Sequence, residues 1–230
     1  MEWKNRLLGL AAIVLLCAPA HGLQKLVKTD RKAANGHCLP KRTQSTQNVL
    51  RRAKIKVSSK PAGRTVAKEV QGALADVVFT IEKIGKGRKH SHRGAHYFFR
   101  KDWGYSFHTP RTNRIEMRRG NQNMSQMVDR SHYGMDNRAV LAHELAHYVS
   151  IRNGQAIQTQ YNWTVWTPCH VTRYAKKNRW EEFAEVYAAY VTNPDLLRGK
   201  GSSCDKARKF MARLLGENQM AKTCRQAKRR

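Results

Sequence analysis

Apolar residues recur at steps of three and four along the chain from Thr65 to Ile84. This spacing places them on one face of an amphipathic helix, which Gly85 would end. The apolar face consists of Val66, Val70, Ala73, Leu74, Val77, Val78, Ile81 and Ile84. The β-branched run from Val77 to Ile81 permits a strand as well, but the period favours a helix.

Three further helices are predicted in the second half of the chain. They cover Arg138 to Asn153, about Arg179 to Val191, and about Ser203 to Leu215. Asp136 or Asn137 can cap the first of them. Pro194 and Gly216 lie where the other two would end.

Short strands are predicted between the first two helices, in residues 86–106 and 111–119, where polar and apolar residues mix loosely. The segment from Arg114 to Arg118 is the candidate for an edge strand that pairs with an extended substrate. The fold class expected is therefore α+β, mainly helical with a small sheet, in one domain over residues 65–220.

The chain is strongly basic, with a formal net charge of +28. Between Gln24 and Arg64 the only acid is Asp30, so residues 21–64 are predicted to form a basic, loosely ordered leader, and residues 221–230 a basic tail. Both could contact a polyanion such as nucleic acid, a cell-wall polymer or an anionic surface. A basic surface that only maintains solubility is the alternative.

Residues 1–20 have the pattern of a secretory signal peptide. A short positive region precedes an apolar run from Leu7 to Leu16, and small residues follow at Ala18 and Ala20. Cleavage near Ala20 would give a secreted or periplasmic protein. A lipoprotein signal around Cys17 is the minor alternative. The apolar run is shorter than the roughly 20 residues that span a bilayer, and no later segment comes close, so no transmembrane segment is expected.

Four cysteines remain after the signal peptide: Cys38, Cys169, Cys204 and Cys224. An even number in an exported chain predicts two disulfides, with three possible pairings. The sequence contains no Cys-x-x-Cys pair, so a zinc ribbon is not predicted.

The pentapeptide His143-Glu144-Leu145-Ala146-His147 lies within the predicted helix from Arg138 to Asn153. Residues four apart on a helix have Cβ atoms about 5–6 Å apart, so His143 and His147 can bind one metal ion. Glu144 lies one step round the helix, where it can act as a general base on a metal-bound water. The opposite face, predicted to be core, consists of Leu141, Leu145, Tyr148 and Val149.

A zinc enzyme of this kind needs a third protein ligand and an open position for water. Glu181 and Glu185 lie on one face of the helix from Arg179 to Val191, opposite a face predicted to be core. Glu181 is the predicted ligand, and Glu185 can accept a hydrogen bond from a ligand histidine. His170, in the connecting loop, is the rival ligand. Alternatively, the acids of this helix only balance the basic charge.

A metzincin is not predicted, because Ser150 and Asn153 stand where that class has its Gly and its third His. The order of the remaining candidates resembles another family. Tyr174 follows the pentapeptide, Glu181 comes seven residues after it, and Glu185 four residues later. With the sequence Glu-Glu-Phe-Ala-Glu at 181–185, this pattern is similar to the catalytic domain of anthrax lethal factor and to related secreted Pro-Pro endopeptidases.

The resemblance covers Arg138 to Tyr190, and the helix at residues 65–84 fits it loosely. It implies a zincin-like fold and a gluzincin site with one Zn2+ per chain. The implied ligands are His143, His147 and Glu181, with Glu144 as the base and Tyr174 as the proton donor or oxyanion partner. The basic leader and Cys169 depart from the family pattern.

The expected activity is hydrolysis of peptide bonds in a protein or peptide substrate, by zinc-activated water with a glutamate general base. A secreted metalloendopeptidase is therefore the main interpretation. One alternative is a secreted basic protein that binds a polyanion and has a structural or inactive zinc site. Another is a toxin-like peptidase that acts inside a second cell.

Overall fold

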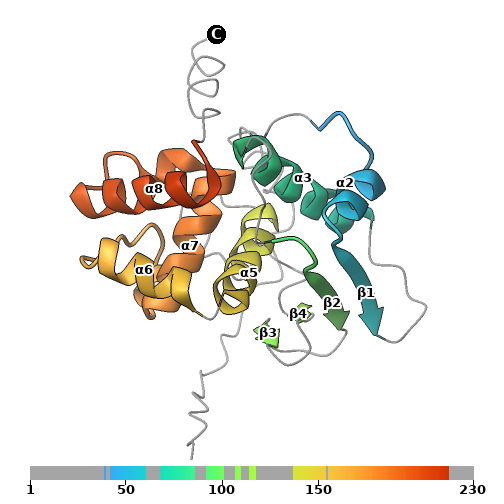
Figure 1. Cartoon of the computed structure of the whole chain (residues 1–230), viewed down its shortest axis with the longest axis horizontal. Coiled ribbons are helices and arrows are strands. Elements are labelled where there is room, and N and C mark those ends of the chain that lie inside the picture. The colour runs from blue at the N-terminus through green and yellow to red at the C-terminus, as the bar shows by residue number, and fades with distance from the viewer. Residues whose placement is uncertain are drawn as a thin grey trace, which may run out of the picture.

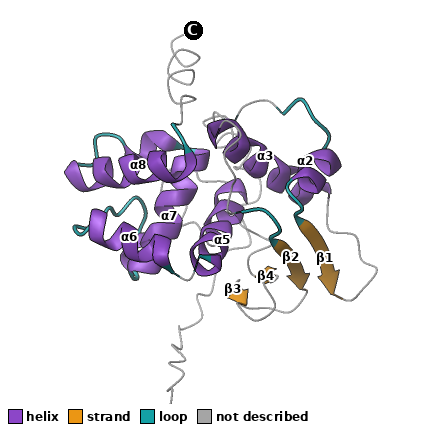
Figure 2. Cartoon of the chain, in the orientation of Figure 1, coloured by secondary structure: helices purple, strands orange, loops and turns teal. Residues whose placement is uncertain are grey.

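The computed structural model describes residues 39, 42–60, 68–85, 92–100, 107–109, 114–117, 137–153 and 155–217. This part of the chain is mainly helical with one small sheet, so the predicted α+β class is confirmed (Figures 1 and 2). The elements are α2 (Thr46–Arg52), β1 (Lys56–Lys60), α3 (Lys68–Gly85), β2 (His96–Arg100), β3 (Phe107–Thr109), β4 (Arg114–Met117), α5 (Asn137–Arg152), α6 (Ala156–Thr164), the 3-10 turn η3 (Tyr174–Lys176), α7 (Arg179–Thr192), the 3-10 turn η4 (Pro194–Leu197) and α8 (Ser202–Leu215).

The four strands form one sheet in the order β1-β2-β4-β3. The strands β1, β2 and β4 are parallel, and β3 is antiparallel to β4. Parallel neighbours cannot be joined by a tight turn, and α3 makes the crossover from β1 to β2. Alternate residues of the inner strands face the core, namely Tyr97, Phe99, Ile115 and Met117.

The prediction that residues 114–118 form an edge strand is wrong. A strand forms at Arg114–Met117, but it lies between β2 and β3. The alternation of Ile115 and Met117 shows which face of a strand is buried, and it carries no information about the strand's neighbours. In the described sheet the two edges are β1 and β3.

The helix α5 lies between the sheet and the other C-terminal helices (Figure 1). It packs against α3 on one side and α7 on the other, and it also contacts β3 and β4. Its predicted core residues are fully buried: Leu141, Leu145, Tyr148 and Val149. Ala184, Ala188 and Ala189 of α7 are buried as well, and small side chains allow two helices to approach closely.

The prediction of a loosely ordered leader over residues 21–64 is wrong for residues 46–60, which form α2 and β1. Val49, Leu50, Ala53 and Ile55 are buried in the core. Ion pairs join this region to α3, since Arg42 contacts Asp76 and Arg52 contacts Glu82. Basic residues dominate the sequence of this segment, and they obscure the pattern of its short apolar cluster. That cluster is sufficient to pack one helix and one strand against the core.

The helix α6 was not predicted, because most of its side chains are polar and only Gln158 and Tyr161 are buried. After it, Cys169 forms a disulfide with Cys204 of α8, which is one of the pairs considered from the sequence. Cys38, Cys224, the signal peptide at residues 1–20 and the tail at residues 221–230 lie outside the described residues. Among the residues that are described, no helix combines the length and the apolar character of a bilayer span.

Candidate metal centre

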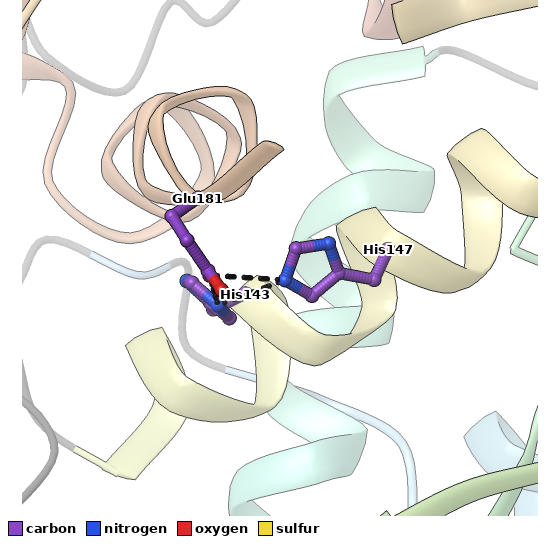
Figure 3. A group of neighbouring side chains, drawn as sticks. All are labelled: His143, His147 and Glu181. Carbon is purple, nitrogen blue, oxygen red and sulfur yellow. Dashed lines mark hydrogen bonds and ion pairs between the residues drawn. The ribbon is translucent and has the colours of Figure 1, made fainter. Parts of the chain in front are cut away.

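The helix α5 carries His143 and His147 on the face that looks toward α7 (Figure 3). The two rings lie nearly perpendicular to each other, with centroids 4.8 Å apart. A hydrogen bond of 2.8 Å from the Tyr97 hydroxyl to the Leu141 carbonyl ties α5 to β2. The buried face of α5 and this bond hold the helix in one rotation, and both imidazoles approach Glu181 of α7.

The helix α7 supplies the acidic side of the site. Its cap is Asn178, whose side-chain oxygen accepts hydrogen bonds of 2.9 Å from the backbone N–H groups of Trp180 and Glu181. Glu181 therefore lies in the first turn, where the exposed N–H groups of a helix favour a negative charge. The cap fixes the start of α7 and directs the Glu181 side chain at the two histidines (Figure 3).

Three atoms, one from each side chain, form a small triangle. Nε2 of His143 lies 3.1 Å from Oε2 of Glu181 and also 3.1 Å from Nε2 of His147. The distance from Nε2 of His147 to Oε2 of Glu181 is 3.3 Å. Two atoms bonded to one ion at about 2.0–2.1 Å and at a tetrahedral angle are roughly 3.3 Å apart. His143, His147 and Glu181 could therefore hold a metal ion, as their spacing in the sequence predicted.

The predicted contact of Glu185 with a ligand histidine is present. Oε1 of Glu185 lies 2.7 Å from Nδ1 of His143, and its other oxygen accepts a hydrogen bond of 2.6 Å from the Thr172 hydroxyl. A carboxylate at Nδ1 holds a proton on that nitrogen and leaves Nε2 to face the centre. Thr172 is a loop residue that nothing in the sequence singled out.

When no metal ion is bound, His143 of this centre is protonated. Burial lowers the pKa of His143, but hydrogen bonds to Glu181 and Glu185 and their negative charges outweigh burial and raise it to about 10. Burial alone would raise the pKa of Glu181, whereas its hydrogen bonds to His143 and His147 hold it well below its usual range. The metal-free centre is therefore an ion pair between a protonated His143 and an ionised Glu181.

Glu144 is only 2% exposed, although it carries a carboxyl group. Its Oε2 atom is buried and has no hydrogen-bond partner among the described residues. Burial raises the pKa of Glu144, and the charges of His143 and His147 act in the opposite direction. A buried carboxyl oxygen without a partner calls for an explanation, and a catalytic role beside a metal site is one that fits the position of Glu144.

Tyr174 lies at the start of η3, and its ring is close to that of His143. The centroids of the two rings are 5.7 Å apart. Burial raises the pKa of Tyr174 well above its ordinary value, and the nearby charges of Glu181 and Glu144 raise it further, so the phenol keeps its proton. The structure thus brings the candidate Tyr174 to the same centre as the three potential ligands.

Glu182 does not join the metal centre, and its side chain is buried in the protein. It is 1% exposed, and one of its oxygens accepts hydrogen bonds of 2.9 Å from the Tyr161 hydroxyl and from the Cys169 backbone N–H. Arg179 forms an ion pair with its other oxygen. Glu182 and Glu185 are both buried, so the alternative that these acids only balance the surface charge is wrong.

His170, the rival third ligand, is exposed and does not belong to the group of potential metal ligands in the described residues. Comparisons of the chain with family models, with curated proteins and with solved structures found no match.

Proposed function

We propose that the protein is a zinc-dependent metalloendopeptidase of the gluzincin type with a zincin-like fold. The observation that carries this proposal is the position of Glu144, whose buried Oε2 atom has no hydrogen-bond partner among the described residues and whose carboxyl group lies close to the potential ligands His143 and His147. The ligands alone would support metal binding of any kind. A base next to them supports hydrolysis.

The donor set favours zinc over the harder cations. Two imidazoles and one carboxylate suit Zn2+, whereas Ca2+ and Mg2+ prefer sites made of oxygen atoms. Fe2+ in oxygenases also binds two histidines and one carboxylate, and Glu144 distinguishes the two cases, because hydrolysis requires a base at this place. Structural zinc sites have four protein ligands, and the described residues supply three.

Each residue of the centre has a separate task in the proposed reaction. When bound, zinc supplies a Lewis acid and a water whose pKa falls toward about 7. Glu144 accepts a proton from the attacking water and passes it to the leaving amine. Tyr174, which keeps its phenol proton, donates a hydrogen bond to the developing oxyanion. Glu185 keeps the proton on Nδ1 of His143, so that Nε2 stays available to the metal.

The strand β3 is the candidate for binding an extended peptide, in place of residues 114–118. It pairs with β4 along one edge, and it has no other strand neighbour in the described sheet. It also contacts α5, which carries the ligands His143 and His147. A peptide that adds to β3 as a further strand would run close to the metal centre.

Export of the protein belongs to the same proposal. A disulfide between Cys169 and Cys204 is typical of proteins that fold in an oxidising compartment. The basic charge would raise the local concentration of acidic substrates around such a protein. Its natural substrate would be a protein or peptide outside the cytoplasm.

The test is cleavage of a peptide library by the zinc-loaded protein, combined with metal analysis. Glu144→Gln should retain one zinc per chain and lose about 100- to 10,000-fold in turnover, because only the base is removed. Glu181→Ala should lose zinc. Glu217→Gln, at an exposed position, is the matched control and should behave like the wild type. Full activity of Glu144→Gln, or stoichiometric zinc in Glu181→Ala, would overturn the proposal.

A further inference from the structure

Two tryptophans are exposed to an unusual degree. Trp163 is 83% exposed and Trp166 is 76% exposed, and they are the only large apolar side chains with high exposure in the described part of the chain. Trp180, at the start of α7, is partly exposed. Single exposed apolar residues are common on protein surfaces, whereas two highly exposed tryptophans only three residues apart in the sequence indicate a contact surface.

The exposure of Trp163 follows from the way α6 packs. Tyr161 is fully buried, and its ring contacts the rings of Phe183 and Phe210, each with a centroid distance of 5.3 Å. Trp163 lies two residues later, on the opposite side of the helix, and therefore points away from this core. In Figure 1, α6 lies at the outer side of the helical half, away from the sheet.

The exposure of Trp166 does not result from a loose loop. Just before it, Val165 is fully buried, and its carbonyl accepts a hydrogen bond from Arg179. Just after the loop, Cys169 is held by its disulfide to Cys204 and by the hydrogen bond of its N–H to Glu182. The exposed residues from 166 to 168 thus lie in a short segment that is held at both ends.

The surroundings of the two tryptophans are basic. From residue 145 to residue 180 the chain contains no Asp or Glu. Lys176 and Lys177 are exposed, and they lie just before Arg179, which contacts the Val165 carbonyl next to Trp166. The hydrogen bond from Arg179 to Val165 therefore places the segment that carries Trp166 beside the N-terminal end of α7, which Lys176 and Lys177 directly precede.

We propose that this tryptophan surface, made of Trp163, Trp166, Lys176 and Lys177, binds an anionic lipid bilayer. Tryptophan rings are amphipathic and partition to the boundary between lipid headgroups and acyl chains. Lysines near the membrane surface attract anionic headgroups. Apolar burial and electrostatic attraction to anionic lipids both strengthen binding to a bilayer, and this surface supplies both.

The shape of the surface favours a bilayer over single-stranded nucleic acid, the other polyanion that aromatic and basic residues bind. Proteins that bind single strands stack the bases on rings in a charged groove. Trp163 and Trp166 instead expose most of their area, so their rings stand out from the surface. Protruding rings can enter the headgroup layer of a membrane.

Trp163, Trp166 and Lys176 take no part in the proposed reaction, and Lys177 borders it through a contact of 3.5 Å from its ammonium to the Tyr174 hydroxyl, so the proposal goes beyond the proposed enzymatic function. The surface nevertheless adjoins the centre along the chain, because Tyr174 lies two residues before Lys176. Attachment at this surface would hold the metal centre near the membrane. A substrate at the membrane surface would then meet the centre at raised local concentration.

The experiment measures sedimentation of the full-length protein with vesicles of phosphatidylcholine, with and without phosphatidylglycerol. The wild type should bind the anionic vesicles, and its tryptophan emission should shift to shorter wavelength. Trp163→Ser/Trp166→Ser should weaken this binding about tenfold or more and abolish most of the shift. Lys206→Ala/Lys209→Ala, which removes two exposed lysines of α8, is the matched control and should bind like the wild type.

Three results would overturn the proposal. One is the absence of wild-type binding to anionic vesicles. Another is equal binding by the wild type and the double tryptophan variant, which would leave attraction to the rest of the basic chain as the cause. The third is that a single-stranded oligonucleotide binds the double variant more weakly than the wild type, while the double variant retains its binding to vesicles. Circular dichroism and zinc content of each variant show whether the fold is intact, and neither measurement depends on peptidase activity.

Discussion

Thr172 donates a hydrogen bond of 2.6 Å to Glu185 and thereby acts on the metal centre without touching it. The same hydroxyl oxygen accepts a hydrogen bond of 3.1 Å from the Ala175 backbone N–H, within the turn η3 that begins at Tyr174. One buried side chain thus connects the carboxylate that orients His143 with the turn that positions the phenol.

Replacement of Thr172 by valine should therefore weaken zinc binding and turnover together. Valine has the same shape and lacks the hydroxyl, so Glu185 loses one of its two contacts and the His143 ring is held less firmly. Loss of such a contact typically costs about 10- to 100-fold in metal affinity or activity. Zinc affinity measured by competition with a chelator, together with kcat, checks this prediction.

Thr172→Ser is the matched control for this position, because it keeps the hydroxyl and removes one methyl group. It should restore most of the zinc affinity. If the serine and valine variants bound zinc equally weakly, the effect would come from packing of the side chain and the hydrogen bond would not matter.

Tyr174→Phe should retain zinc and lose turnover. The raised pKa of Tyr174 means that the wild-type phenol keeps its proton at neutral pH and can donate a hydrogen bond. Removal of one donor to an oxyanion lowers kcat by about 100- to 1,000-fold. Steady-state kinetics should show this fall in kcat with little change in zinc content.

Tyr190→Phe provides the comparison for Tyr174→Phe. Its hydroxyl donates a hydrogen bond of 2.7 Å to the Gly216 carbonyl, at the far end of α7 from the metal centre. This variant should lower stability slightly and leave kcat unchanged. Equal losses of kcat in the two variants would contradict a specific role for Tyr174.

The disulfide between Cys169 and Cys204 should make a large contribution to stability. The two cysteines are 35 residues apart in the sequence, and closing a loop of that size stabilises a protein by about 4 kcal/mol in the chain-entropy model. Urea unfolding of Cys169→Ala/Cys204→Ala should show a decrease of this order in the free energy of unfolding. A change of less than about 1 kcal/mol would contradict the prediction.

The helical part of the structure could be predicted from the sequence, because a helix is a local structure with a fixed period. The period and the end signals predicted α3, α5, α7 and α8 within a few residues of their bounds. The same geometry placed His143 and His147 on one face of α5, and it placed Glu181 and Glu185 on one face of α7. Given two such faces, an approach of α5 to α7 was the simplest way to complete a metal site.

The parts that could not be predicted depend on contacts between distant segments. The neighbours of β4 are set by the pairing of strands far apart in the sequence, and the burial of Val49 and Leu50 depends on α3. Thr172 has no motif of its own, and its role arises only where the loop after α6 meets α7. The sequence likewise allowed three disulfide pairings, and proximity in the fold selected the partner of Cys169.

Zinc binding should release about one proton near pH 7, and zinc affinity should rise with pH. The pKa of His143 in the metal-free protein is about 10, above the ordinary value of 6.5, so this residue is protonated at pH 7 and must lose a proton to bind a metal. Glu181, whose pKa is held low, is already ionised and releases none.

The same proton stabilises the metal-free fold. The raised pKa of His143 contributes stability that is full below about pH 6.5 and is lost as the pH rises toward about 10. Calorimetric titration with zinc in buffers of different ionisation enthalpy measures the number of protons released. In Glu185→Ala, Nδ1 of His143 loses its acceptor and the pKa of His143 falls, so fewer protons should be released at pH 7 than in the wild type. An observed heat that is independent of the buffer in the wild type would show that His143 is neutral before the metal binds.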